Sequence, residues 1–290
     1  MKGQFNKPIW AVMISLVLIV GTLTLSIPHQ EAYATSISDC TGDSSVDGER
    51  LILTANIPNF ANDISGIDCI VIIHNNVTLD CKGFTIDGTD VFSSNGVFVT
   101  GDNVTIKNCT VTDFSNGILL FGSDGSTVTK NNLTLNFVGI QVLDSDNNKI
   151  SANTADLNQV GLSCFFSTGN KFERNDADDN AFDGLRFLDC DNSLVSANLF
   201  RGNDLLGIRL TIDSDNNTFK RNTADDSVDG INITSDSDSN KFTANTTNLN
   251  TEEGIDDDST GGGTAGTANT YKRNSCSGNT TPSTPAGLCS

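Results

Sequence analysis

Short runs of alternating apolar and polar residues recur along this chain at an almost constant interval. Each run follows a glycine, as in GIQVL, GLRFL, GIRLT and GINIT. These glycines are about 21 to 24 residues apart: Gly96, Gly117, Gly139, Gly161, Gly184, Gly207, Gly230 and Gly254. Alternation at period two is typical of half-buried β-strands, because successive side chains point to opposite faces. A repeat of constant length predicts one structural unit that is stacked many times.

Each unit is expected to contain three short strands. The strand after the glycine has inward positions such as Ile140 and Val142, or Leu185 and Phe187. The second strand is marked by Ile150, Phe172, Leu194, Phe219, Phe242 and Tyr271, and the third by Ala155, Ala177, Phe200, Ala224 and Thr247. Strands this short bury little apolar surface alone. The units are therefore expected to stack about 4.8 Å apart, as a solenoid of parallel sheets around a narrow core.

An asparagine closes a second repeated phrase, as in NKISAN, NKFERN and NTFKRN. These asparagines are Asn108, Asn131, Asn153, Asn175, Asn198, Asn222, Asn245 and Asn274. If they stack inside the solenoid, each amide can bond to the next and so satisfy groups that are costly to bury unpaired. We interpret them as structural residues.

The repeat phrases resemble those of a known family. NVTLDCKGFTIDG, NVTIKNCTV and NKFERNDADDNAFDGL are similar to sequences of right-handed parallel β-helix repeat proteins, and the similarity extends from Asn76 to Asn274. It implies an all-β, right-handed parallel β-helix of about ten coils. The most similar groups are the NosD-like periplasmic copper-binding proteins and the secreted carbohydrate-binding and sugar-hydrolase (pectin-lyase-like) β-helices. Because such folds serve many activities, the resemblance leaves the function open.

The chain divides into four expected parts. Residues 1–34 are predicted to be a signal peptide, because Lys2 and Lys7 precede an apolar run and Ala32-Tyr33-Ala34 resembles a cleavage site. A retained membrane anchor is the alternative. Residues 35–75 form an N-terminal cap, 76–274 the repeats with a flexible loop at 258–268, and 275–290 a C-terminal cap.

The eight cysteines all follow the predicted signal peptide, which favours an oxidising compartment. Spacing alone leaves their connectivity open, but the repeat suggests pairs. Cys40 with Cys69 would close the N-terminal cap, and Cys276 with Cys289 the C-terminal one. Cys81 and Cys109 lie about one repeat apart, as do Cys164 and Cys190.

The chain is strongly acidic, with 17 Lys and Arg against 36 Asp and Glu and a formal net charge of −19. Such a surface repels nucleic acid and anionic lipid and attracts cations. We therefore expect no nucleic-acid partner, and membrane contact only through an uncleaved signal segment. Together with the cysteines, this indicates a protein secreted to the extracellular space or the cell surface.

The residues that several activities of similar proteins require are absent from this chain. Copper binding of the NosD kind needs thiolate, Met or His ligands, and after residue 34 the chain has no Met and only His74. The Gly-His-Gly and Asp-Pro-His-Asp motifs of polysaccharide-modifying β-helices are absent. Aromatic platforms for sugar rings are expected to be missing, because no Trp remains and most Phe fall on predicted inward positions.

One candidate catalytic site remains. Arg186 and Arg209 occupy the same outward position of adjacent units, and Asp183 and Asp229 lie just before the corresponding glycines. Arginine beside carboxylates could bind a uronate and supply a base. We favour the alternative that these residues form an exposed ion pair between turns.

Acidic turns suggest a cation site. LDSDNN, LDCDN, TIDSDNN and SDSDSN fall at one corner of successive units and carry Asp144, Asp146, Asp189, Asp191, Asp213, Asp215, Asp236 and Asp238. Stacked carboxylates repel one another, and a hard cation such as Ca²⁺ would relieve the repulsion. The alternative is that Asp and Asn are simply good turn formers.

The sequence therefore favours an exported binding or structural module that engages extracellular polysaccharide or cell-surface glycan, rather than an enzyme. A calcium-assisted polysaccharide lyase or glycoside hydrolase is one alternative. An accessory factor for copper-enzyme maturation, of the NosD kind, is another.

Overall fold

The computed structural model describes residues 34–40, 43–58 and 68–290. The predicted signal peptide lies outside the described residues except for Ala34. Contacts group the chain into Met1–Glu31 and Ala32–Ser290, and only the second unit is described below. Within the described part, no helix is long and apolar enough to cross a membrane.

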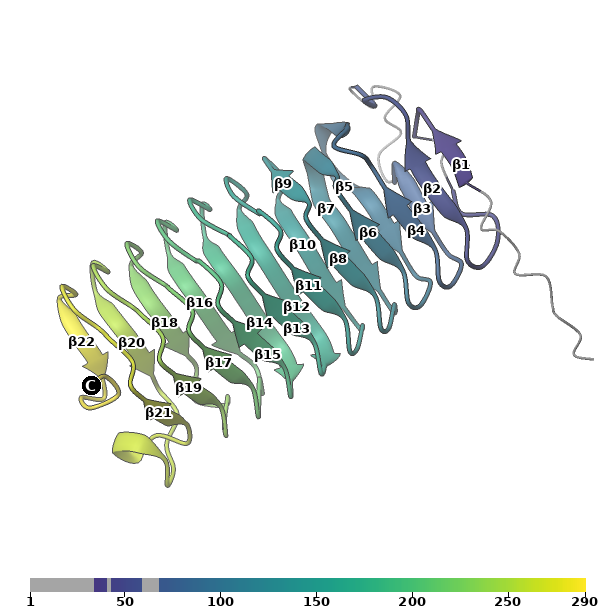
Figure 1. The fold of residues 1–290 in the computed structure, drawn as a ribbon. Helices are drawn as coiled ribbons and strands as arrows, with labels where there is room; N and C mark the ends of the chain where they lie inside the picture. The colour runs from purple at the N-terminus through teal and green to yellow at the C-terminus, as the bar shows by residue number, and fades with distance from the viewer. Residues whose placement is uncertain (1–33, 41–42, 59–67) are drawn as a thin grey trace, which may run out of the picture. The chain divides into compact units, whose positions relative to one another are not determined.

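Two parallel sheets run along the length of the solenoid (Figure 1). Sheet A stacks β1 (Ala34–Ile37), β2 (Arg50–Leu53), β4 (Thr78–Asp80), β6 (Thr105–Lys107), β8 (Thr127–Thr129), β11 (Lys149–Ser151), β13 (Lys171–Glu173), β15 (Leu194–Ser196), β17 (Thr218–Lys220), β19 (Lys241–Thr243) and β21 (Thr270–Lys272). Sheet B stacks β3 (Ile70–Ile72), β5 (Thr85–Val99), β7 (Thr110–Phe121), β10 (Val138–Leu143), β12 (Val160–Thr168), β14 (Asp183–Asp191), β16 (Leu206–Thr211), β18 (Asp229–Ile233), β20 (Glu253–Asp257) and β22 (Thr281–Thr284).

The third expected strand of each unit is reduced to a row of single bridges. This row follows β9 (Asn132–Thr134), which pairs with β7, and links Asn132, Thr154, Asp176, Leu199, Thr223, Thr246 and Ser275. The residues after these bridges are buried as predicted: Ala155, Ala177, Phe200, Ala224 and Thr247. The unit is thus a coil with two sheet walls and one thin wall.

These strands confirm the predicted fold class, an all-β parallel β-helix. Eight of the ten stacked strands in sheet B carry the repeated glycine, from β5 to β20. The two outermost strands, β3 and β22, lack it and belong to the ends of the stack. The regular turns are therefore eight, slightly fewer than the expected ten coils. In the segment predicted as a flexible loop, residues 264–266 form the short 3-10 helix η1 (Thr264–Gly266).

The repeated glycine is required by close approach between neighbouring turns. A Cβ atom built on Gly161 would lie 2.7 Å from the Cβ of Ala177 and 2.8 Å from the carbonyl oxygen of Gly184. Both distances are far below van der Waals contact. Any larger residue would push the turns apart, which explains why the glycine recurs in each unit.

The core consists of the predicted inward columns. Ile140, Val142, Leu185 and Phe187 are fully buried in sheet B. In sheet A the inward column is Ile150, Phe172, Val195, Phe219, Phe242 and Tyr271. The expected Leu194 is wrong, because it pairs with Lys171 and Thr218 on the outer side. Adjacent Leu and Val gave the pattern two possible registers at this strand.

The asparagine ladder is confirmed from Asn131 onward. The side-chain Nδ2 of Asn131 donates to Oδ1 of Asn153 at 3.0 Å, and the same bond repeats through Asn175, Asn198, Asn222, Asn245 and Asn274. Asn108 was wrongly included. Its neighbour Cys109 occupies the ladder position and donates its N–H to Asn131, while Asn108 is half-buried and donates to Asp80.

The ladder has a counterpart at another corner: side-chain amides join Asn136 to Asn158 and Asn180 to Asn203, and the Asn158 backbone N–H donates to Oδ1 of Asn180. All four suggested cysteine pairs form disulfides: Cys40–Cys69, Cys81–Cys109, Cys164–Cys190 and Cys276–Cys289. The inward side chains of the solenoid therefore make structural contacts, and a functional site is expected on its outer faces.

Candidate functional site

The outer face of sheet B changes character along the stack. Its central outward column, one residue per turn, reads Phe98, Leu119, Gln141, Ser163, Arg186, Arg209, Asn232, Asp256 and Thr284. The column is apolar in the first turns, polar in the middle and ionic toward the C-terminal end. Parallel pairing in register places equivalent side chains about 4.8 Å apart, so each stretch forms a continuous surface.

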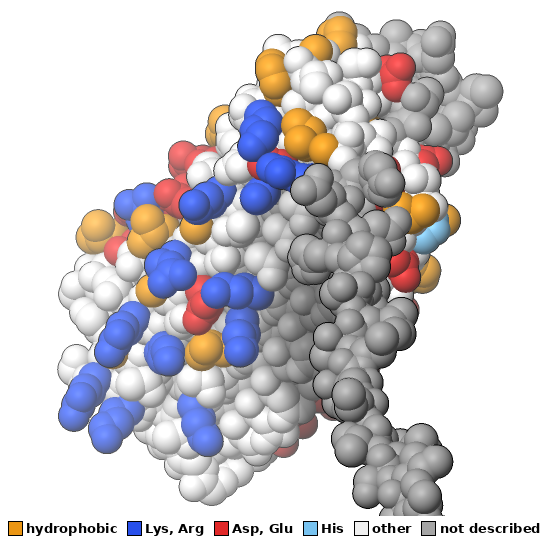
Figure 2. Space-filling view, turned by 45° about the vertical axis from the view of Figure 1, so that its right-hand side comes forward, with side chains coloured by type: hydrophobic (Ala, Val, Ile, Leu, Met, Phe, Trp, Pro, Cys, Tyr) orange, Lys and Arg blue, Asp and Glu red, His pale blue; other side chains and the backbone are white. Residues whose placement is uncertain are grey.

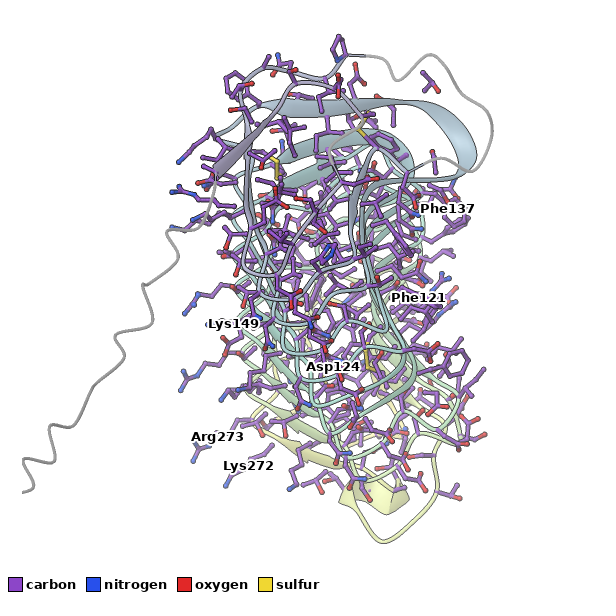
Figure 3. The ribbon with its side chains drawn as sticks, turned by 90° about the vertical axis from the view of Figure 1, so that its right-hand side faces the viewer. Phe121, Asp124, Phe137, Lys149, Lys272 and Arg273 are labelled. Carbon is purple, nitrogen blue, oxygen red and sulfur yellow. A yellow bond between two sulfur atoms is a disulfide. The ribbon has the colours of Figure 1, made fainter. Side chains whose placement is uncertain are left out.

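Aromatic side chains line the apolar part of this face. The rings of Phe98 and Phe121 stack with centroids 6.3 Å apart, and Phe121 is 43% exposed. Phe137 is 44% exposed, and Figure 3 shows it on the same side of the molecule as Phe121. Among the phenylalanines whose side chains are described, about half belong to the core, fewer than the sequence indicated. Those that are half-buried or exposed are Phe84, Phe98, Phe121, Phe137, Phe165, Phe166 and Phe182.

A groove of about 230 Å³ lies where the aromatic and polar stretches meet. We call it the sheet B groove, and its defining residues are Phe137, Gln141, Ser163, Phe165 and Arg186. The Ser163 side chain is only 1% exposed, and its hydroxyl has no hydrogen-bond partner among the described residues. A buried hydroxyl without a partner costs about 1–3 kcal/mol, so a ligand that bonds to it would recover that energy.

Arg186 is held at the end of the groove by a buried carboxylate. Its Nε and Nη2 atoms lie 2.7 and 2.6 Å from Oδ2 of Asp183, which is fully buried. Arg209 occupies the same slot of the next turn, as predicted, and its Nη1 lies 3.8 Å from the same oxygen. Because the shared carboxylate is buried, this arrangement differs from the exposed ion pair that we favoured from the sequence.

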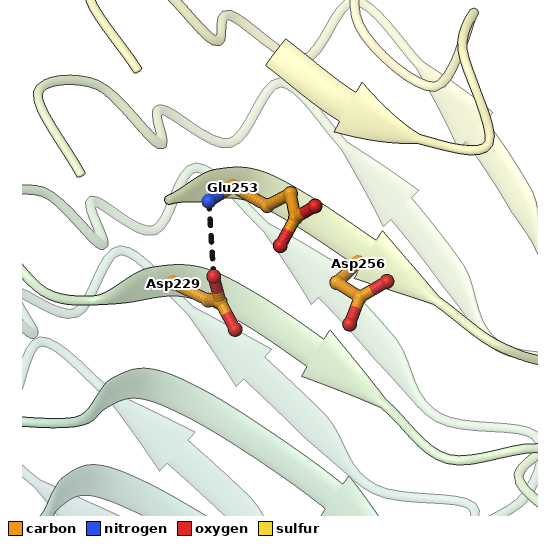
Figure 4. A group of neighbouring side chains, drawn as sticks. All are labelled: Asp229, Glu253 and Asp256. Atoms are coloured by element: carbon orange, nitrogen blue, oxygen red, sulfur yellow. Dashed lines mark hydrogen bonds between the residues drawn. The ribbon is translucent and has the colours of Figure 1, made fainter. Parts of the chain in front are cut away.

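Asp229, the fourth predicted site residue, belongs to a separate acidic group with Glu253 and Asp256 (Figure 4). Ligand oxygens of the three residues lie within 4.8 Å of one another. The Glu253 backbone N–H donates to Asp229 at 3.0 Å, and Asn232 donates to Asp256 at 3.0 Å. These three carboxylates are hard ligands and could hold a cation such as Ca²⁺.

Burial and crowding change the acidity of this group. Burial, together with the charges of Asp258 and Glu253, raises the pKa of Asp256 to about 6. Burial also raises the pKa of Asp229, and the neighbouring Glu253 adds to this effect. A carboxyl group that titrates near neutrality can exchange protons with a ligand at physiological pH. The sequence-based search missed Glu253 and Asp256, although the acidic run around Gly254 in TEEGIDDD was a visible signal.

Several carboxylates of the predicted acidic corner accept hydrogen bonds from backbone N–H groups. Oδ1 of Asp146 accepts the N–H of Thr168 at 2.7 Å, and Oδ1 of Asp191 accepts the N–H of Asp215 at 2.7 Å. Asp215 does the same for Asp238 at 2.6 Å. These bonds tie each turn to the next, in keeping with the turn-forming alternative.

The other acids of this corner do not form an unbroken stack. Asp144, Asp189 and Asp213 adopt positive φ, and Phe166 takes the same conformation between the first two. Asp236 accepts a hydrogen bond from the Thr234 hydroxyl. Among the described residues, the acids close enough to share one ion are those of the Asp229 group.

The candidate copper ligands are also engaged in structure. All eight cysteines are in disulfides. Nδ1 of His74 lies 3.0 Å from the carbonyl oxygen of Ser44 and 3.1 Å from its hydroxyl, so the ring joins the N-terminal cap to the first turn.

The outer face of sheet A is basic, which the net charge of the chain did not indicate. Figure 2 shows Lys and Arg side chains gathered on one face, with few acids among them. In Figure 3, Lys149, Lys272 and Arg273 point away from the side that carries Phe121 and Phe137. The net charge of the chain therefore does not describe the local charge of this face.

Comparison with known proteins establishes the family. The chain matches the family described as the right handed beta helix region at residues 34–186, 95–247 and 156–282. These matches cover most of the sequence, and the chain belongs to this family. No curated protein matches the sequence.

Solved structures share the fold at low sequence identity. The A-module of mannuronan C-5 epimerase AlgE6 from Azotobacter vinelandii has 14% identity and a TM-score of 0.62, over 87% of this chain and 84% of its own. The Dettilon tailspike protein has 14% identity and a TM-score of 0.68, over 88% of this chain and 56% of its own. The periplasmic alginate epimerase AlgG has 13% identity and a TM-score of 0.53, over 82% and 78%. A variant of this epimerase is matched over only 65% of its length.

Proposed function

We propose that the protein is an exported glycan-binding module, and that a polysaccharide chain lies in the sheet B groove. The observation that carries this proposal is the composition of the groove, where Phe137 and Phe165 flank Gln141, Ser163 and Arg186. Ligand sites of this kind combine apolar walls with a few convergent polar groups.

Each of these groups has a role toward a sugar. An aromatic ring offers a flat apolar surface to the C–H face of a pyranose. The Gln141 amide and the Ser163 hydroxyl can both donate to and accept from sugar hydroxyls. The Arg186 guanidinium, oriented by Asp183, can form a paired hydrogen bond to the carboxylate of a uronic acid.

Two further observations support the proposal. Four disulfides fit an exported protein. The proteins with similar folds include epimerases named for alginate and mannuronan. At this level of identity the likeness supports only the fold, so the argument for a glycan rests on the groove.

A glycan array, screened with and without calcium, would identify the ligand class, and calorimetry would then compare variants. We expect Phe165→Ala and Gln141→Ala each to weaken binding on the order of tenfold, which corresponds to loss of one stacking or hydrogen-bonding contact. Phe166→Ala is the matched control, because Phe166 is exposed at the corner outside the groove. Equal losses for Phe165→Ala and Phe166→Ala would contradict the proposal.

A calcium-assisted lyase or hydrolase is the second candidate, and one observation favours it. The pKa of Asp256 is raised to about 6, and Asp256 lies in the same outward column as Arg209, two turns away. A carboxylate that titrates near neutral pH, in the same column as an arginine, can act as a general base on a uronate. The test is an assay for new chain ends from bound polysaccharide in calcium or EDTA, with Asp256→Asn as the inactive comparison. Polysaccharide that stays intact in both conditions would exclude this candidate.

A further inference from the structure

The strongest unexplained feature is the charge on the outer face of sheet A. Although the chain carries a net charge of −19, ten cations project from this sheet and from the corner that follows it between β6 and β21. Arg50 and Lys82, which precede this stretch, pair with Asp80. We call this surface the basic face, and it consists of Lys107, Lys130, Lys149, Lys171, Arg174, Lys220, Arg221, Lys241, Lys272 and Arg273. All of these except Lys107 are exposed.

The cations at the corner follow a regular order. From β6 to β21 the residue immediately after each sheet A strand adopts positive φ, and from β8 onward these residues are Lys130, Ala152, Arg174, Ala197, Arg221, Ala244 and Arg273. All of these residues except the last donate a backbone N–H to the next turn, as from Arg174 to Ser196 at 3.1 Å, which shows that they are stacked. A cation thus recurs on every second turn, about 10 Å apart.

Most of these cations have no acidic partner in the described structure. On the basic face, Lys149 pairs with Glu173 at 3.8 Å and Lys107 lies 3.7 Å from Asp80. The other eight form no ion pair among the described residues, although acids are abundant elsewhere on the chain. Like charges on adjacent turns repel, so alanine between them reduces the repulsion while the face remains positive.

The side chains between the cations are mainly hydroxylated. The remaining outward positions from β8 to β21 are Thr127, Thr129, Ser151, Glu173, Leu194, Ser196, Thr218, Thr243 and Thr270. No aromatic ring is among them, whereas single-stranded nucleic acid binds to basic grooves that also stack its bases. Leu194 is the one large apolar residue of the set, whereas membrane-surface binding needs a broad apolar stripe.

We infer that the basic face binds a linear polyanionic polysaccharide that runs along the stack of turns. Its carboxylate or sulfate groups would meet the cations, and its hydroxyls would bond to the threonines between them. The 10 Å interval of the corner cations is close to the length of a disaccharide in an extended chain. This surface is on the opposite side of the molecule from the sheet B groove, so the two sites are independent.

The test is calorimetric titration with dextran sulfate and polygalacturonate, with uncharged dextran as the negative control. We expect both polyanions to bind and dextran not to bind. The variant Lys130→Gln/Arg174→Gln/Arg221→Gln/Arg273→Gln should bind on the order of tenfold more weakly, and the slope of log K against log salt should fall by about 3 for four lost contacts. Ala152→Gln/Ala197→Gln/Ala244→Gln is the matched control, which changes the intervening positions without removing charge.

A variant that binds more tightly than the parent tests the inference separately, because a folding defect could weaken binding but would not strengthen it. Ala152→Lys/Ala197→Lys places cations on the intervening turns, and it should bind dextran sulfate more tightly than the parent. Unchanged affinity in the four-cation variant would overturn the inference. So would tighter binding to oligo(dT) or to phosphatidylglycerol vesicles than to either polysaccharide. The variant Phe165→Ala is predicted to retain dextran sulfate binding, because dextran sulfate carries no uronate for the groove, so failure of the groove proposal would be recognised separately.

Discussion

Sheet A and sheet B surround the same core in the same register, yet their outer faces have opposite chemistry. Sheet A presents cations separated by Thr and Ser, in strands of three residues through most of the stack. Sheet B presents phenylalanines, then a polar groove, then buried and half-buried acids around two arginines. In a solenoid the inward positions are fixed by stacking, whereas each outward column can vary. The difference shows that a single repeat can carry two unrelated surfaces.

Two ion pairs, one from each face, show how burial changes the strength of such an interaction. On sheet B the carboxylate of Asp183 is fully buried and shared by Arg186 and Arg209. On sheet A the pair of Lys149 and Glu173 is 3.8 Å apart, with side-chain exposures of 46% and 24%. Solvent screens an exposed pair, while a buried charge depends on its partners.

The largest expected effect would come from breaking these pairs. We predict that Asp183→Ala lowers the free energy of unfolding by about 3 kcal/mol, because it leaves a partly buried guanidinium without its carboxylate. Glu173→Ala should lower it by no more than about 0.5 kcal/mol. Urea denaturation followed by circular dichroism measures both changes.

The neighbouring turn provides a control for the Asp183 prediction. Val160 and Ser163 occupy the positions of Asp183 and Arg186 one turn earlier. The variant Asp183→Val/Arg186→Ser copies that turn and should recover most of the lost stability, because a matched apolar replacement of a buried pair is often neutral. Equal losses for Asp183→Ala and Glu173→Ala would contradict the expected difference between the buried pair and the exposed pair.

The inward-facing residues could be predicted from the sequence because their pattern repeats in every turn. The glycine, the apolar alternation and the asparagine ladder each have a single structural solution when turns stack. Errors arose where the phrase was ambiguous by one residue, as at Asn108 beside Cys109 and at Leu194 beside Val195. A shift of one residue exchanges the inner and outer faces of a strand.

The surfaces formed by the outward-facing residues could be predicted only in part. Alternation alone places Ser163 and Phe165 outward in VGLSCFF, so the polar floor of the groove was within reach of the sequence. Its other wall, Phe137, comes from a loop whose position depends on the whole turn. Net charge is a sum over the chain, and it concealed the separation of cations onto sheet A. That separation becomes visible only when residues about 22 apart are known to be neighbours.

The two faces should also respond to pH in opposite directions, with a smaller effect. Asp256 on sheet B has a pKa raised to about 6, so the folded protein binds its proton more tightly than the unfolded chain does. Its contribution to stability is therefore present at low pH and is lost as pH rises from about 4 through about 6. We predict that Asp256→Asn raises stability at pH 7 by about 1 kcal/mol, after allowance for solvent screening, and has no such effect at pH 4.

Asp80 on sheet A is expected to change the stability with pH in the opposite direction. Burial alone would raise its pKa, but hydrogen bonds from Lys82 and Asn108 and the charge of Lys82 lower it to about 2. Its contribution is present at neutral pH and is lost as pH falls from about 4 through about 2. Thermal melts of Asp80→Asn and Asp256→Asn across this range would show the two slopes. Slopes of the same sign would contradict the assignment.

The smallest expected effect concerns the corner that follows sheet A. Ala197 adopts a φ of 56°, which costs an L-residue about 1–2 kcal/mol, whereas glycine avoids this strain and loses about 0.5–1 kcal/mol through backbone entropy. Ala197→Gly should therefore stabilise the protein by about 0.5 kcal/mol, or a melting temperature higher by about 1–2 °C. Because no cation is removed, polyanion binding should not change. A loss of binding in this variant would mean that the shape of the corner, rather than its charge, distinguishes sheet A from sheet B.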